Sequence, residues 1–178
     1  TLGMRSVLDI LRVMWRLMRL IRTTRPDVVQ TWMYHADLLG GVAARLAGNR
    51  NVIWGIRTTD VTAGGTRATA FVRQLCAWVS RTVPHTIVCA ADESRRAHIA
   101  VGYDAARMVV VPNGFDLIRL VATPAQRNAL RFQCGFEHEL VVVGYLGRFH
   151  PAKDQANFVR AAGLLARQFS NARFLMVG

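Results

Sequence analysis

The sequence predicts an α/β protein built around a parallel sheet. Three observations support this prediction. Short β-branched runs recur along the 178 residues, segments of about 10 to 15 residues with helical periodicity separate them, and glycines or prolines stand at many of the junctions. Strand–helix–strand repeats of this kind are typical of parallel sheets with helices on both faces, which we expect here.

The first part of the chain alternates helices with strands. Pro26 ends an opening helical pattern, Gly48 and Gly102 follow two later helical segments, and Pro112 ends a β-branched run. These patterns predict helices at 5–25, 35–46, 67–81 and 92–101, and strands at 27–32, 51–56, 86–90 and 108–111.

A polar stretch then separates two groups of elements. It opens with Asn113 and Gly114, residues that favour a turn with positive φ. One short helix is predicted at 126–134, followed by a strand, a helix and a strand at 140–147, 154–169 and 173–177. One strand–helix–strand unit is too small for a complete sheet domain. We therefore predict a first domain over 1–112, a connection over 113–139 and the start of a second domain over 140–178.

The composition indicates a folded protein. Hydrophobic residues make up 52% of the chain and charged residues 19%, the opposite of a disordered composition. No uncharged apolar run reaches the ~18 residues that span a bilayer, and no signal-peptide pattern occurs at the start, so we expect a soluble protein. Cys76, Cys89 and Cys134 lack the spacing of metal ligands and are expected to be reduced packing residues of a cytosolic protein.

Basic residues are densest in the opening helix. The chain carries 23 Lys and Arg against 11 Asp and Glu, a formal charge of +12. Charged side chains recur every three or four residues and so share one helix face, at Arg5, Asp9, Arg12, Arg16 and Arg19. Either this face is the solvated side of a helix that covers a sheet, or it meets anionic lipid headgroups. Nucleic-acid binding is not favoured, because neither interleaved aromatic residues nor a reading helix accompanies the charge.

The loop at 147–154 is the strongest candidate for a binding site. It follows a predicted strand and opens a helix, where open parallel sheets bind ligands. Gly147 permits close approach of a ligand to the backbone, Arg148 offers a planar fork to phosphate oxygens, and Lys153 supplies an ammonium group. These residues predict a phosphate site; the alternative is a solvated loop that happens to carry two cations.

A second candidate is His35, which also follows a strand and opens a helix. A neutral imidazole there could donate or accept a hydrogen bond at a sugar or acyl group. The alternative is a packed or capping histidine. His85, His98 and His138 have no partner residues at an informative spacing.

Three segments together resemble the retaining glycosyltransferases of group 1, also called family four, which have the GT-B fold. They are 25–37 (RPDVVQTWMYHAD), 110–116 (VVPNGFD) and 147–154 (GRFHPAKD), and their order and spacing agree with that family. The resemblance implies two Rossmann-like domains facing a cleft. Residues 1–112 would then be part of the acceptor-side domain, and 140–178 the start of the nucleotide-sugar-binding domain.

The resemblance also implies an activity. A sugar would pass, with retention of anomeric configuration, from a nucleotide-diphosphate sugar to a glycan or lipid-linked acceptor in cell-surface polysaccharide biosynthesis. The enzyme would work in the cytoplasm or peripherally at the inner face of the membrane.

Individual roles follow by the same resemblance. Gly147, Arg148 and Lys153 would hold the donor diphosphate, and His35 would be the catalytic residue beside the transferred sugar. Asn113 and Gly114 would shape the interdomain cleft, and neither a cofactor nor a catalytic metal is expected.

Two features of the family pattern lie outside the sequence. Its glycine-rich opening loop would precede Thr1, and its acidic pair would follow Gly178, so we expect an internal segment of a longer enzyme. Two other functions stay open: a GT-B-type sugar-nucleotide epimerase, and a non-catalytic basic module that binds anionic membrane or nucleic acid.

Overall fold

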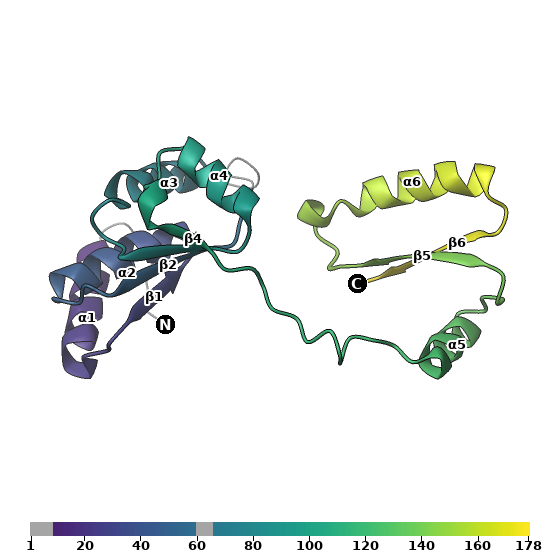
Figure 1. The fold of residues 1–178 in the computed structure, drawn as a ribbon. Helices are drawn as coiled ribbons and strands as arrows, with labels where there is room; N and C mark the ends of the chain where they lie inside the picture. Colours follow the sequence, from purple (N-terminus) through teal and green to yellow (C-terminus); the bar gives the residue numbers. More distant parts are fainter. Residues whose placement is uncertain (1–8, 60–65) are drawn as a thin grey trace. The chain divides into compact units, whose positions relative to one another are not determined.

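The structure is a computed structural model that describes residues 9–59 and 66–178. The chain forms two compact units, Thr1–Gly114 and Phe115–Gly178, and each contains its own parallel sheet (Figure 1). Within the described ranges, no helix is both long enough and apolar enough to cross a membrane.

Unit 1 alternates helices and strands, as the sequence predicts. Its helices are α1 (Asp9–Thr24), α2 (Tyr34–Leu46), α3 (Arg67–Val79) and α4 (Asp92–Ala100). Its strands are β1 (Val29–Trp32), β2 (Val52–Ile56), β3 (Thr86–Cys89) and β4 (Met108–Val110), and a 3-10 turn, η1 (Ala105–Arg107), precedes β4. Arg5, the first residue of the predicted opening helix, lies outside the described residues. Gly48 and Gly102 follow α2 and α4 with φ of 95° and 100°, so both helices end as predicted.

The four strands in the described part of unit 1 lie in chain order, β1-β2-β3-β4, and all pairs are parallel. Successive right-handed crossovers in that order turn to the same face of the sheet. In agreement, α2 contacts both α1 and α3. The expectation of helices on both faces is therefore wrong for the described part of unit 1, because the strand order, which sequence periodicity does not reveal, decides the covered face.

Burial along the strands shows the same one-sided cover. On the helix-covered face, side chains are buried at Val52, Trp54, Ile56, Ile87 and Cys89. On the opposite face, side chains stay exposed at Gln30 and Trp32 of β1 and at Val109 of β4. The core of unit 1 therefore lies between the sheet and the layer of helices.

Two adjacent glycines let α2 lie close to the sheet. A Cβ added at Gly41 would stand 2.7 Å from Trp54 Nε1 and 2.8 Å from Val83 Cγ1, and one added at Gly40 would stand 2.9 Å from Thr31 Cγ2. All of these distances are shorter than a normal van der Waals contact. The close packing of α2 fixes where its amino end meets the carboxyl end of β1.

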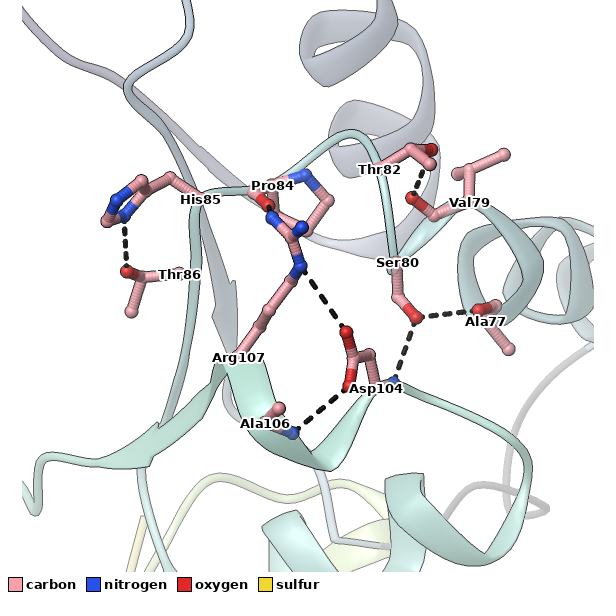
Figure 2. A network of polar contacts seen from close by, with 10 residues as sticks. All are labelled: Ala77, Val79, Ser80, Thr82, Pro84, His85, Thr86, Asp104, Ala106 and Arg107. Atoms are coloured by element: carbon pink, nitrogen blue, oxygen red, sulfur yellow. Dashed lines mark hydrogen bonds and ion pairs between the residues drawn. The ribbon is translucent and has the colours of Figure 1, made fainter.

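A polar network joins the amino ends of β3 and β4 (Figure 2). Ser80 follows α3 and donates from Oγ to the Ala77 carbonyl at 2.6 Å, while the Asp104 backbone N–H donates to Ser80 Oγ at 2.9 Å. The Asp104 carboxylate forms an ion pair with Arg107 at 3.3 Å, and Arg107 donates to the Pro84 carbonyl. Because this network lies at the amino ends of the strands, the carboxyl ends stay open for a site.

Unit 2 contains two parallel strands and two α-helices. The elements are α5 (Pro124–Gln133), β5 (Val141–Leu146), a 3-10 turn η2 (Pro151–Lys153), α6 (Gln155–Gln168) and β6 (Ala172–Val177). Pro124 begins α5 behind a Thr123–Gln126 capping box. The Phe158 ring of α6 lies 5.1 Å from the Tyr145 ring of β5 and 6.3 Å from the Phe174 ring of β6, so α6 packs on this sheet.

Replacing Gly41 with valine should destabilise unit 1. The added side chain must displace the buried Trp54 indole or the β-branched Val83, and overpacking of this kind typically costs ~1–3 kcal/mol. Thermal unfolding would measure the loss. Gly163→Val on α6 is the control, since a Cβ there meets nothing within 4 Å. Equal effects of the two substitutions would contradict the close contact of α2 with the sheet.

Candidate functional site

A cavity of about 470 Å³ opens at the carboxyl ends of β1 and β2. Its lining includes Trp32, His35, Asp37, Arg57 and Thr58. Parallel strands end at one edge of the sheet, so the residues that follow β1 and β2 meet there. The cavity is therefore a candidate for the ligand site of unit 1. His35, the second residue of α2, is one of its lining residues.

Trp32 supplies an aromatic surface to this cavity. Its side chain is 50% exposed, and its indole lies against the backbone of Gly55 on the neighbouring strand, where an added Cβ would overlap the ring. A flat aromatic surface beside hydrogen-bonding groups suits the mixed apolar and polar faces of a sugar ring.

The buried side chain of His98 holds the junction between β1 and α2 in place. Met33, with φ of 79°, occupies the left-handed region that non-glycine residues seldom adopt, and no side chain caps the start of α2 there. The next residue, Tyr34, bonds through its hydroxyl to His98 Nε2 at 2.8 Å. His98 is fully buried, and its Nδ1 lies 2.7 Å from the Ser94 carbonyl.

These contacts define the proton positions. A carbonyl only accepts, so His98 Nδ1 carries the proton and the Tyr34 hydroxyl donates to Nε2. Burial lowers the pKa of His98, which keeps the imidazole neutral at pH 7. Ser94 in turn donates to the Thr58 carbonyl at 2.7 Å. Hydrogen bonds made by His98 and Ser94 thus connect the start of α2 with the segment that follows β2.

His98 was not a candidate from the sequence. Its partner Ser94 lies four residues earlier on the same helix face, which is a usable signal. Its other partner, Tyr34, is 64 positions away, and only the fold brings it close.

Asp37 is a second buried polar residue at the cavity. It is 2% exposed, and Thr31 Oγ1 donates to its Oδ1 at 2.6 Å. Burial raises the pKa of the Asp37 carboxyl to about 7, although the hydrogen bond from Thr31 opposes the shift. The carboxyl can therefore change protonation near neutral pH.

The predicted cleft residues adopt a different backbone from the one expected. Residues 111–116 belong to no turn, helix or strand, and neither Asn113 nor Gly114 has positive φ, so the expectation of a turn at these residues is wrong. Instead, Arg57 Nη2 donates to Asn113 Oδ1 at 3.0 Å. This bond joins the segment after β2 to the segment after β4, at the same edge of the sheet. Close packing does not require a glycine at position 114, since a Cβ added to Gly114 would meet no atom within 4 Å.

In unit 2, Gly147, Arg148 and Lys153 belong to the segment between β5 and α6. The Gly147 N–H donates to the Val177 carbonyl at 2.9 Å and continues the pairing of β5 with β6. Gln155 donates to the backbone carbonyl of Arg148, and the Tyr145 hydroxyl donates to that of Lys153 at 2.7 Å. The backbone at both cations is thus held in place while both residues stay exposed.

The start of α6 already holds one carboxylate. Asp154 adopts φ of 51°, and its side chain accepts a hydrogen bond from the Asn157 N–H at 3.3 Å. That interaction caps the helix and uses one of its free N–H groups. Any phosphate at this loop would therefore depend on Arg148 and Lys153 more than on the helix end itself.

Neither a hollow in unit 2 nor a metal cluster in the described part of the chain adds to these candidates. The hollow, about 870 Å³, lies beside α5 and the amino end of β5, away from the carboxyl end where Arg148 stands. Among the described residues, no group of three or more His, Cys, Asp or Glu could hold a metal ion. Cys76 and Cys89 are buried free thiols, and burial raises their pKa to about 12 and about 11.

The family model for Glycosyltransferase Family 4 matches residues 1–119. This match spans more than half of the chain, which therefore belongs to that family. The predicted GT-B-like, Rossmann-like α/β fold is confirmed. No curated protein matches the sequence.

Solved structures resemble the whole chain. Anabaena Alr3699/HepE in complex with UDP-glucose is 20% identical with a TM-score of 0.77, over 97% of this chain and 45% of its own. Its complex with UDP is 15% identical with a TM-score of 0.72, over 94% and 52%. The UDP-GlcNAc 2-epimerase of Neisseria meningitidis, bound to UDP-GlcNAc, is 10% identical with a TM-score of 0.53, over 99% and 50%. At these identities the likeness shows the fold alone, and the chain spans about half the length of these proteins.

Replacing Asp37 with asparagine should stabilise the protein in a pH-dependent way. Between about pH 4 and 7 the folded state holds a proton that the unfolded carboxyl, with a pKa of ~3.9, has released. Wild-type stability from this group therefore falls as the pH rises towards 7, and above 7 a buried charge remains. Asparagine imitates the neutral form and can still accept the bond from Thr31.

Urea unfolding at several pH values would measure this effect. The gain of Asp37→Asn over wild type should be on the order of 2 to 4 kcal/mol at pH 8, given ~1.4 kcal/mol per pKa unit, and should shrink towards pH 4. A gain that does not change with pH would contradict a raised pKa.

Replacing His98 with phenylalanine should destabilise unit 1. The aromatic ring is kept, but the partly buried Tyr34 hydroxyl loses its partner, and leaving such a group unsatisfied costs ~1–3 kcal/mol. The Ser94 carbonyl loses its bond from the ring but remains within the hydrogen bonding of α4. His85→Phe is the matched control, because His85 is exposed and should change stability by less than ~0.5 kcal/mol. Equal stability of the two variants would exclude the role given to His98.

Proposed function

We propose that this chain is part of a glycosyltransferase that moves a sugar from a nucleotide-diphosphate sugar to a glycan or lipid-linked acceptor, with retention of anomeric configuration. The observation that carries the proposal is the family match over residues 1–119. In this proposal, unit 1 belongs to the acceptor-side domain and unit 2 begins the nucleotide-sugar-binding domain. The enzyme would serve cell-surface polysaccharide biosynthesis in the cytoplasm, at the inner face of the membrane.

Arg148 and Lys153 would hold the donor diphosphate. When the bond between the anomeric carbon and the leaving phosphate oxygen breaks, negative charge grows on the nucleoside diphosphate. A guanidinium and an ammonium group on a fixed backbone stabilise that charge more in the transition state than in the ground state. Both residues are exposed on a backbone held by Gln155 and Tyr145, and in this mechanism the two cations make a metal ion unnecessary.

The cavity of unit 1 would receive the reacting sugars. His35 would act there as the catalytic residue, Trp32 would offer its aromatic surface, and Asn113 would be oriented by Arg57. The hydrogen bonds made by His98 would keep His35 in position by fixing Tyr34, its neighbour in α2.

A sugar-nucleotide epimerase is the second candidate function. It is favoured by the likeness to epimerases such as that of Neisseria meningitidis, with a TM-score of 0.53 against 0.77 for HepE. An epimerase would isomerise the donor sugar with no acceptor present, whereas a transferase would release nucleoside diphosphate only as it forms a new glycosidic bond. Product analysis of the full-length enzyme with and without acceptor separates the two.

Replacing both Arg148 and Lys153 with alanine should weaken nucleoside diphosphate binding by at least tenfold. Hydrogen bonds to charged groups contribute ~1.5–3 kcal/mol each, and tenfold in affinity is ~1.4 kcal/mol. Titration calorimetry of the full-length protein with UDP and other nucleoside diphosphates would measure the loss. The contacts of Gln155 and Tyr145 end on backbone carbonyls, so the loop should keep its shape in the variant.

The matched control for this test removes two arginines of α6. Arg160→Ala with Arg167→Ala takes away the same charge from exposed positions in the same unit. Unchanged affinity and transfer rate in the loop variant, or equal losses in both variants, would refute the site.

A further inference from the structure

The outward face of α1 combines exposed arginines with large exposed apolar side chains. Successive residues of an α-helix are turned by about 100°, so Arg12, Arg16 and Arg19 form one narrow stripe. By the same geometry Leu11 and Trp15 lie on one side of this stripe, and Leu20 lies on the other. All three arginines are exposed, and the apolar side chains are 82%, 59% and 54% exposed in chain order.

This face is separate from the face that holds α1 in the fold. Val13 and Ile21 are buried, and Met14, Leu17 and Met18 pack partly against the core. The inner side of α1, which contacts α2, therefore holds this helix in the fold. Exposure of Leu11 and Trp15 is not explained by folding of unit 1.

The charge on this face is available to a partner. The guanidinium of Arg19 lies 5.4 Å from the centre of the Trp15 ring, so cation and aromatic ring form one surface. Asp9 lies on the same helix face, so the stripe of these three arginines and one carboxylate has a formal charge of +2. The whole protein is also strongly basic, with a formal charge of +12.

The kind of partner follows from the mixture. A nucleic acid would use the arginines but offers no apolar layer for leucines that border them. An anionic bilayer offers both, because phosphate headgroups attract arginine while Trp and Leu enter the boundary with the acyl chains. A helix that lies in the membrane plane need not span it.

We propose that α1 docks unit 1 on an anionic lipid bilayer, with Arg12, Arg16 and Arg19 at the headgroups and Leu11, Trp15 and Leu20 inserted beside them. This docking does not depend on the sugar-transfer activity. Val13 and Leu17 of α1 line a hollow together with His35, so this docking would bring His35 and the cavity that it lines close to a lipid surface.

Vesicle flotation of the full-length protein tests the proposal. Wild type should float with vesicles that contain phosphatidylglycerol, should not float with pure phosphatidylcholine vesicles, and should dissociate as salt rises. Changing Arg12, Arg16 and Arg19 to glutamine should reduce the partition coefficient by roughly 100-fold, since each basic residue near an anionic surface contributes severalfold. Arg45→Gln, Arg50→Gln and Arg81→Gln together are the control, because they remove the same charge from exposed positions of the same unit.

Tryptophan fluorescence tests the insertion separately. Anionic vesicles should shift the emission of wild type to shorter wavelength, and Trp15→Phe should abolish this shift. Trp78→Phe should retain it, although Trp78 on α3 is even more exposed, at 77%. Equal loss of flotation in both arginine triples would show a general charge effect and overturn the proposal. So would a vesicle-induced shift that survives Trp15→Phe.

Binding to duplex DNA gives the remaining outcome. If the α1 arginines are required for DNA binding and wild type does not float, the partner is nucleic acid and the proposal is wrong. Donor binding by calorimetry should be the same in the α1 variants as in wild type. The α1 proposal and the sugar-transfer proposal can therefore fail independently.

Discussion

Four parallel strands in chain order impose the arrangement of unit 1. Every strand ends at the same edge of the sheet, so the segments after β1, β2 and β4 meet there although they are far apart in the sequence. The contact of Arg57 with Asn113 and the cavity that both Trp32 and His35 line are direct results. The opposite edge carries the polar network of Ser80, which stabilises the turns without occupying the site.

Buried polar groups give this edge its rigidity and its sensitivity to pH. His98 is neutral and holds Tyr34, while Asp37 is a carboxyl whose protonation changes near pH 7. Asp37 is removed from water where α2 packs closely on the sheet, which Gly40 and Gly41 permit, and the rings of Tyr34 and Tyr103 lie against His98. Burial disfavours the charged form of each, which lowers the pKa of the base and raises the pKa of the acid.

Unit 2 shows a different way to prepare a site. Its loop between β5 and α6 has little burial, and its backbone is fixed by side chains that bond to the carbonyls of Arg148 and Lys153. The two cations remain exposed and solvated. Because they are exposed, these two side chains cost the protein little stability when no ligand is bound. They are also accessible to an anion as large as a diphosphate.

The sequence by itself determined the class of fold, the limits of most elements to within a few residues, and the family. Periodicity, helix-ending glycines and local motifs act over short distances along the chain, and these are the quantities a sequence displays. It also placed Gly147, Arg148 and Lys153 in one loop and His35 at the start of a helix, while their roles stay predictions. The order of the strands was decided only in the tertiary structure, and with it the single covered face of the sheet. The partnership of Tyr34 with His98 and the raised pKa of Asp37 likewise arise from packing between residues distant in sequence, because burial and hydrogen-bond geometry exist only once the chain is folded.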